Sequence, residues 1–196
     1  MSEPRRRADA VRNREAVLDA AEALFARGGA DGVSMNAVAE AAGVGKGTVF
    51  RAFTDRTGLL QALAERRSAP LRQAVESGPS PLGPGTPPRE RVVAVLDALL
   101  GVKLDNQGLY QALEEAGGAA SPYRSPSYGW WHDVLRDDLA RLTGTAGQAD
   151  FLAHALLAAV RADLVAHLTA EERLPVAELR RRLTAYAHAV VPPERE

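Results

Sequence analysis

Apolar residues recur every three or four positions along most of this chain, the spacing that gives a helix one buried face. Near the N-terminus this spacing predicts a helix from about residue 8 or 10 to Arg27, with its apolar face made by Val17, Leu18, Ala21, Leu24 and Phe25. Gly28-Gly29 follows. Because glycine readily takes the left-handed conformation that closes helices, we expect the helix to end there.

Three further helices are predicted close behind the first. Ser34 is a favourable N-cap for a short helix from about Met35 to Ala42. Gly43-Val44-Gly45 predicts a tight turn, and the next helix is expected over Lys46–Phe53. Asp55 then suits the N-cap of a fourth helix that ends near Glu76.

The segment 77–88 is rich in proline and glycine, which predicts a linker or a long surface loop. The stretch 119–129 contains Pro122 and Pro126 and should be irregular at least in part. Helices are expected in the rest of the chain, one opened by Thr86-Pro87 and the others over about 106–116, 130–142, 148–168 and from Pro175 to about Val190. The expected fold class is therefore all-α.

Composition narrows the possible functions. The 196 residues include no cysteine, which excludes disulfides and thiolate metal sites, and the four histidines lack the spacing of a metal site. No apolar run approaches the roughly 20 residues that span a bilayer, and no signal peptide is apparent. We find no catalytic cluster of nucleophile, base and oxyanion donors. We therefore expect a cytoplasmic protein that is not an enzyme and has no cofactor or metal.

Charge is balanced overall, with a net charge of −1, but the N-terminus is basic. The first 14 residues hold five arginines against Glu3 and Asp9, a surplus of three positive charges. A solvated tail and a DNA-contacting arm, built on Arg5, Arg6 and Arg7, explain this surplus equally well.

The segment from Ser34 to Phe53 predicts a helix-turn-helix. Val38, Ala39 and Ala42 give the first helix an apolar face, and Val49 and Phe53 give one to the second. Gly43 permits the sharp turn between them, and the small Ala39 allows a close crossing. In this motif the second helix lies in the major groove of DNA, with its early residues facing base edges and phosphates.

The stretch from Arg14 to Leu60, with Ala39-Glu40-Ala41-Ala42-Gly43-Val44, Lys46-Gly47-Thr48-Val49-Phe50 and Phe53, resembles the N-terminal domain of the tetracycline-repressor-like (TetR) family. The resemblance covers roughly a quarter of the chain. It implies an all-helical homodimer whose variable C-terminal domain binds a small molecule and thereby releases the protein from a pseudo-palindromic DNA operator. We accordingly expect a DNA-binding domain over residues 1–56 and a ligand-binding and dimerisation domain over 57–196.

The resemblance also suggests which residues contact DNA. The predicted set is Ser34, Asn36, Lys46, Gly47, Thr48, Phe50, Arg51 and Arg56, together with Arg5, Arg6 and Arg7. Phe50 stands where the family usually has tyrosine, and Ala52 where it commonly has histidine. Both replacements remove a phosphate contact. An alternative is therefore a ligand-binding or scaffolding module whose DNA binding is weak or nonspecific.

The C-terminal part offers weaker signals for an effector site. Aromatic residues gather in the middle of the chain, and the predicted ligand-binding set is Tyr110, Tyr123, Tyr128, Trp130, Trp131, His154 and Arg161. Ordinary core packing explains each of these residues as well, and Arg161 has a surface ion pair as its simpler role. The alanine-rich helix 148–168 and the last helix are expected to form the dimer interface.

Overall fold

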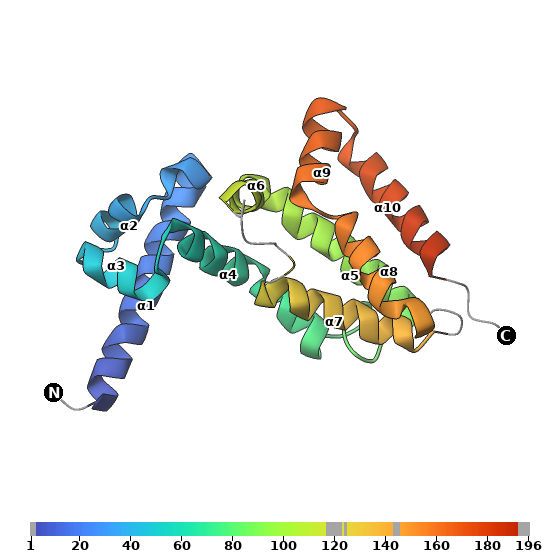
Figure 1. Cartoon of the computed structure of the whole chain (residues 1–196), viewed down its shortest axis with the longest axis horizontal. Helices are drawn as coiled ribbons and strands as arrows, with labels where there is room; N and C mark the ends of the chain where they lie inside the picture. Colours follow the sequence, from blue (N-terminus) through green and yellow to red (C-terminus); the bar gives the residue numbers. More distant parts are fainter. Residues whose placement is uncertain (1–2, 117–122, 124, 143–145, 192–196) are drawn as a thin grey trace. The chain divides into compact units, whose positions relative to one another are not determined.

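The computed structural model describes residues 3–116, 123, 125–142 and 146–191 (Figure 1). All regular elements in these ranges are helices, which confirms the all-α prediction. The chain divides into two compact units, Met1–Arg67 with Gly108–Gly117 (unit 1) and Ser68–Gln107 with Gly118–Glu196 (unit 2). This division differs from the predicted boundary after residue 56, because unit 1 also includes the first half of α4 (Arg56–Ser77) and most of α6 (Gln107–Ala116).

Unit 1 begins with the long helix α1 (Glu3–Gly28), followed by η1 (Ala30–Gly32), α2 (Met35–Ala41) and α3 (Lys46–Phe53). The bounds of α2 and α3 agree with the predictions to within one residue. Helix α1 starts earlier than predicted, so the basic stretch 5–7 has helical backbone. Gly29 follows α1 with φ of 61° and ψ of −160°, so it has the positive φ that favours glycine but not the left-handed helical conformation that was expected there.

The core of unit 1 joins α1, α2, α3 and the start of α4. Val17, Val38, Val49 and Leu59 are each fully buried in it. Burying one such side chain contributes about 1.5–3 kcal/mol. Leu109 of α6 adds a further buried residue to the same cluster, although it lies far along the sequence.

Unit 2 contains α5 (Pro88–Asp105), α7 (Pro126–Ala140), η3 (Ala146–Gln148), α8 (Ala149–Ala158), α9 (Ala162–Ala166), the π-helical turn η4 (His167–Glu171) and α10 (Val176–Val190). Helix α5 packs against α7, α9 and α10, and α7 packs along α8 (Figure 1). Helix α7 begins four residues before the predicted start at Trp130. Ser125 caps it by accepting a hydrogen bond from the Tyr128 amide at 3.1 Å, and Pro126 suits the first turn.

The single helix predicted over 148–168 is wrong. It is broken between α8 and α9, where Arg161 has an extended backbone (φ −64°, ψ 143°). No glycine or proline marks this break. Val160 and Ala162 are 3% and 1% exposed, so packing on both sides of Arg161 accompanies the bend.

By length and composition, Ala149–Glu171 passes as a membrane span, with a mean hydropathy of 1.5, which the sequence analysis did not anticipate. The core helix of a soluble protein passes the same test. Here the segment is bent at Arg161, and Ala153 and Leu156 of α8 are fully buried in the core of unit 2. We therefore assign it to that core.

Unit 2 also contains a buried ion pair between Arg91 of α5 and Asp138 of α7. Nη1 of Arg91 lies 2.8 Å from Oδ2 of Asp138, and the two residues are 8% and 0% exposed. Arg91 also donates to the carbonyl oxygens of Val75, at the end of α4, and Leu82, in the loop that follows. One side chain thus ties this proline-rich loop to three helices.

Candidate functional site

Local hydrogen bonds shape the helix-turn-helix of unit 1. The amide of Ala37 donates to Oγ of Ser34 at 3.1 Å, which confirms Ser34 as the N-cap of α2. Gly43 has φ of 63°, and the amide of Val44 donates to the carbonyl of Ala39 at 3.0 Å. The chain therefore turns sharply between α2 and α3, as the glycine predicts.

The two helices bury the faces that the sequence assigns to them. Val38 and Ala39 of α2 are 0% and 3% exposed, and Val49 and Phe53 of α3 are 0% and 5% exposed. This packing fixes which side of α3 faces solvent. The remaining side of α3 is the surface available to another molecule.

Most of the predicted DNA contacts lie on that available surface. Lys46, Gly47, Phe50 and Arg51 of α3 are exposed, as are Ser34 and Asn36 at the start of α2, while Thr48 is half-buried. Positions 46 and 50, and positions 47 and 51, are neighbours on a helix surface. The exposed residues of α3 thus form one continuous strip.

The strip contains two cationic side chains, of which Arg51 makes hydrogen bonds within α3 and Lys46 makes no ion pair with a described residue. Arg51 folds back along α3, donating from Nε to the Gly47 carbonyl at 3.0 Å and from Nη2 towards Oγ1 of Thr48 at 3.4 Å. Lys46 makes no ion pair with any residue that the structure describes. Its ammonium group is therefore available to a phosphate.

Two other arginines brace the motif. Arg56 donates from Nε to the Val33 carbonyl at 2.8 Å and from Nη2 to the Ala30 carbonyl at 2.7 Å, so its guanidinium ties the start of α4 to the segment before α2. Arg14 of α1, which the sequence did not single out, donates to the Ala52 carbonyl at 3.1 Å. The Arg14 guanidinium also stacks over the ring of Phe53 at 4.4 Å. Arg14 therefore holds the end of α3 against α1, and Arg56 holds the segment before α2 against the start of α4.

The basic N-terminal stretch is described only in part. Arg7 is exposed on α1, and Arg12 forms an ion pair with Asp9. The side chains of Arg5 and Arg6 lie outside the described residues. Their proposed contact with DNA stays a prediction.

The predicted effector residues fall into separate groups. Tyr110 packs against the core of unit 1. In unit 2, Trp130 and Trp131 meet edge to face with ring centroids 4.6 Å apart, and Arg72 stacks over Trp130. Arg161 pairs with Asp163 at 2.7 Å, and the hydrogen bond from Arg161 lowers the pKa of that carboxyl.

Tyr123, Tyr128 and His154 do come together. The hydroxyl of Tyr128 lies 2.6 Å from Nδ1 of His154, and the Tyr123 and Tyr128 rings are 5.1 Å apart, edge to face. Burial, followed by the charge of Tyr123, raises the pKa of Tyr128 above its usual 10, so the Tyr128 hydroxyl is protonated at neutral pH.

His132 of α7 and Asp150 of α8 complete this cluster, although neither belongs to the predicted ligand-binding set. The His132 and His154 ring centroids are 4.0 Å apart, and Nε2 of His132 lies 3.5 Å from Oδ1 of Asp150. The only sequence signal was a repeated spacing of four, in Tyr128/His132 and in Asp150/His154. Which helix faces meet could not be read from that spacing.

Unit 2 also has a surface cavity of about 500 Å³ away from the aromatic cluster. It lies between the end of α5, the turn η4 and the start of α10. Its lining residues are Leu104, Asp105, Gln107, Thr169, Ala170, Val176 and Arg180. None of them belongs to the predicted effector set.

Comparison with known proteins agrees with the geometry of unit 1. A family model described as bacterial regulatory proteins of the tetR family matches residues 17–63, the segment from α1 to α4. An HTH-type transcriptional regulator of Staphylococcus aureus strain USA300 is 28% identical over 169 residues, covering 82% of this chain and 86% of that protein.

Solved structures share the fold of the chain. A TetR-family transcriptional regulator from Rhodococcus sp. has a TM-score of 0.67 at 22% identity, covering 92% of this chain and 98% of that one. A second regulator, from Rhodococcus sp. Rha1, has a TM-score of 0.65 at 20% identity, covering 90% and 95%. With its helix-turn-helix and its matched segment 17–63, unit 1 contains a DNA-binding domain of the tetR family of bacterial regulatory proteins, and most of the chain is similar to an HTH-type transcriptional regulator.

Proposed function

We propose that this regulator is a homodimeric cytoplasmic repressor, which binds a pseudo-palindromic operator and is released by a small molecule bound in unit 2. The observation that carries the DNA-binding part is the exposed strip on α3. It presents Lys46, Gly47, Phe50 and Arg51, and the half-buried Thr48 lies on the same helix. Lys46 and the Ser34 hydroxyl suit phosphate, and Phe50 suits a thymine methyl or the sugar backbone.

Exposed apolar side chains support a dimer that uses the last helices. Among the described residues, four large hydrophobic side chains on α8, α9 or α10 are exposed: Phe151 (71%), Leu164 (39%), Val176 (44%) and Tyr186 (39%). Exposed apolar groups that gather into one patch mark protein–protein interaction sites, so these side chains are candidates for an interface with a second copy. A two-fold dimer places its recognition helices about 34–36 Å apart, one turn of DNA.

Two features of unit 2 support a small-molecule effector. The cavity between α5, η4 and α10, at about 500 Å³, has the size of sites that hold small ligands. The cluster of Tyr123, Tyr128 and His154 offers aromatic and polar contacts elsewhere in the unit. Release follows if the effector binds the DNA-free conformation more tightly than the DNA-bound one.

Phe50 and Ala52 favour a second candidate, a ligand-binding module with weak, nonspecific DNA binding. Phe50 is 48% exposed and offers no hydroxyl to a phosphate. Nonspecific binding depends on phosphate charge alone, so it falls steeply with salt and shows no preferred sequence.

Fluorescence anisotropy separates these candidates. The full-length protein is titrated into labelled duplexes taken from the promoter beside its own gene and into scrambled duplexes. A repressor binds one promoter duplex at least about 10³-fold more tightly than the scrambled one. In Lys46→Ala the dimer loses two phosphate contacts, so the slope of log K against log salt becomes shallower by about 1.8.

Arg27→Ala provides the matched control, because it also removes one exposed positive charge from unit 1. Arg27 lies 13 residues along α1 from Arg14, which contacts the end of α3, and this separation corresponds to about 20 Å of helix. The control should bind like the wild type. Equal affinity for promoter and scrambled duplexes, or unchanged binding by Lys46→Ala and Thr48→Ala, would exclude the operator-binding proposal.

A further inference from the structure

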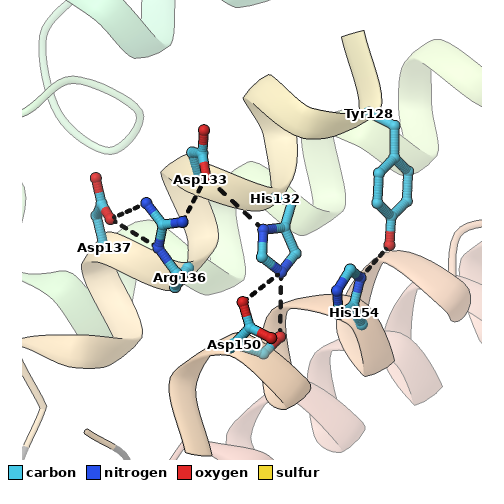
Figure 2. A network of polar contacts seen from close by, with 7 residues as sticks. All are labelled: Tyr128, His132, Asp133, Arg136, Asp137, Asp150 and His154. Carbon is cyan, nitrogen blue, oxygen red and sulfur yellow. Dashed lines mark hydrogen bonds and ion pairs between the residues drawn. The ribbon is translucent and has the colours of Figure 1, made fainter. Parts of the chain in front are cut away.

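Two pairs of polar side chains face each other where α7 packs along α8 (Figure 2). Tyr128 and His132 lie one helical turn apart on α7, and Asp150 and His154 lie one turn apart on α8. Residues four apart occupy the same face of a helix. The packing therefore brings two imidazoles and one carboxylate together from segments 18 or more residues apart.

These three groups form a ligand set. One nitrogen of His132, one nitrogen of His154 and one carboxylate oxygen of Asp150 all lie within 4.8 Å of one another. Zinc bonds of 2.0–2.1 Å in a tetrahedron place two ligand atoms about 3.3 Å apart. The Asp150 side chain is 75% exposed and His154 is also exposed, so both can move the remaining ångström or so.

His132 is the rigid member of the set. It is 7% exposed, and its Nδ1 faces Oδ1 of Asp133 at 3.8 Å. Asp133 is itself held by Nη1 of Arg136 at 2.7 Å. Nε2 of His132 lies 3.1 Å from the Asp150 carbonyl oxygen and 3.5 Å from Oδ1 of the same residue (Figure 2). Because a carbonyl oxygen only accepts, Nε2 donates its proton there in the absence of a metal. A bound metal ion would take the place of that proton, and the ring proton would then lie on Nδ1, on the side of Asp133.

His154 is oriented by a hydrogen bond to Tyr128. Its Nδ1 lies 2.6 Å from the Tyr128 hydroxyl oxygen. When Nδ1 carries the ring proton and donates it to that oxygen, the lone pair of Nε2 is left for a ligand. The His154 ring also lies nearly parallel to that of Tyr128, with an interplanar angle of 13° and centroids 5.8 Å apart, which limits its rotation.

We propose that His132, His154 and Asp150 bind one divalent transition-metal ion of the zinc type between α7 and α8. Two imidazoles and a carboxylate suit zinc, cobalt or nickel, whereas magnesium and calcium prefer oxygen ligands. Three protein ligands leave a coordination position for water or for another small molecule. This inference goes beyond the proposed function and holds whether or not the protein binds an operator.

Isothermal titration calorimetry with zinc chloride tests the proposal on the full-length protein after chelator treatment. We expect one zinc ion per chain, and visible d–d absorption when cobalt(II) replaces zinc. His154→Ala and Asp150→Asn change exposed side chains, so both variants should keep the helical circular-dichroism spectrum of the wild type. Loss of an orienting group outside the ligand set costs about 10–100-fold in metal affinity, so removal of a ligand should cost about 100-fold or more.

Two further variants make the test specific. Asp133→Asn should weaken zinc binding by up to about 10-fold, because it removes a negative charge 3.8 Å from Nδ1 of His132. His188→Ala, which removes an exposed histidine of α10, should leave the affinity within about 2-fold, since it lies outside the ligand set. The proposal is overturned if the wild type shows no saturable zinc binding below millimolar concentration. It is equally overturned if His154→Ala and Asp150→Asn bind zinc as tightly as His188→Ala.

Discussion

Replacing Arg91 by alanine should destabilise unit 2 more than removal of any exposed arginine. The guanidinium donates to Asp138 at 2.8 Å, to the Val75 carbonyl at 2.9 Å and to the Leu82 carbonyl at 2.8 Å. Arg91→Ala therefore removes three hydrogen bonds at once. It also leaves the fully buried Asp138 carboxylate without its buried partner.

The magnitude follows from burial. Breaking a buried ion pair by removing one partner costs about 3–5 kcal/mol, because the remaining charge stays desolvated. Arg141 provides an internal comparison, since it pairs with the other oxygen of the same Asp138 but its side chain is 52% exposed. An exposed pair contributes about 0–1 kcal/mol. The two arginines thus bind one carboxylate but should differ several-fold in their contribution to stability.

Urea unfolding followed by circular dichroism measures both variants against the wild type. We expect Arg91→Ala to lower the free energy of unfolding by about 3–5 kcal/mol and the melting temperature by about 6–20 °C. Arg141→Ala should lower the free energy of unfolding by about 1 kcal/mol or less. If Arg91→Ala stays within about 1 kcal/mol of the wild type, or if both variants lose the same amount, burial does not set the strength of this pair.

Two further predictions concern a turn and an ion pair. Gly43→Ala should destabilise unit 1 by about 1–2 kcal/mol in urea unfolding, because φ of 63° strains any L-residue. Gly45 has φ of −67°, so Gly45→Ala should have little effect on the free energy of unfolding. Equal losses in the two variants would contradict this reasoning. Hydrogen bonds from Arg181 and then Arg182 lower the pKa of Glu178 from 4.5 to about 2. The stability that this depressed pKa contributes is complete above pH 4.5 and is lost as the pH falls towards 2. The pKa of Glu178, measured by NMR titration, should therefore rise back towards 4.5 when both arginines are replaced by alanine. An unchanged pKa would show that the two arginines do not cause the shift.

The helix-turn-helix could be predicted from sequence because short-range contacts define it. Ser34 caps α2 through an amide three residues away, and Gly43 turns the chain by its own backbone angle. The apolar spacing of Val38, Val49 and Phe53 then fixes which faces are buried. Caps, turns and helical periodicity operate within a few residues, so the local sequence contains them.

Only the tertiary structure determined the features of unit 2 that depend on distant partners. Arg91 and Asp138 are 47 positions apart, and nothing local marks either as buried. The break before α9 has no glycine or proline, and the approach of His132 to Asp150 and His154 depends on how α7 is rotated against α8. Helical spacing shows which residues share a face, but the packing of whole helices selects the face that each one meets.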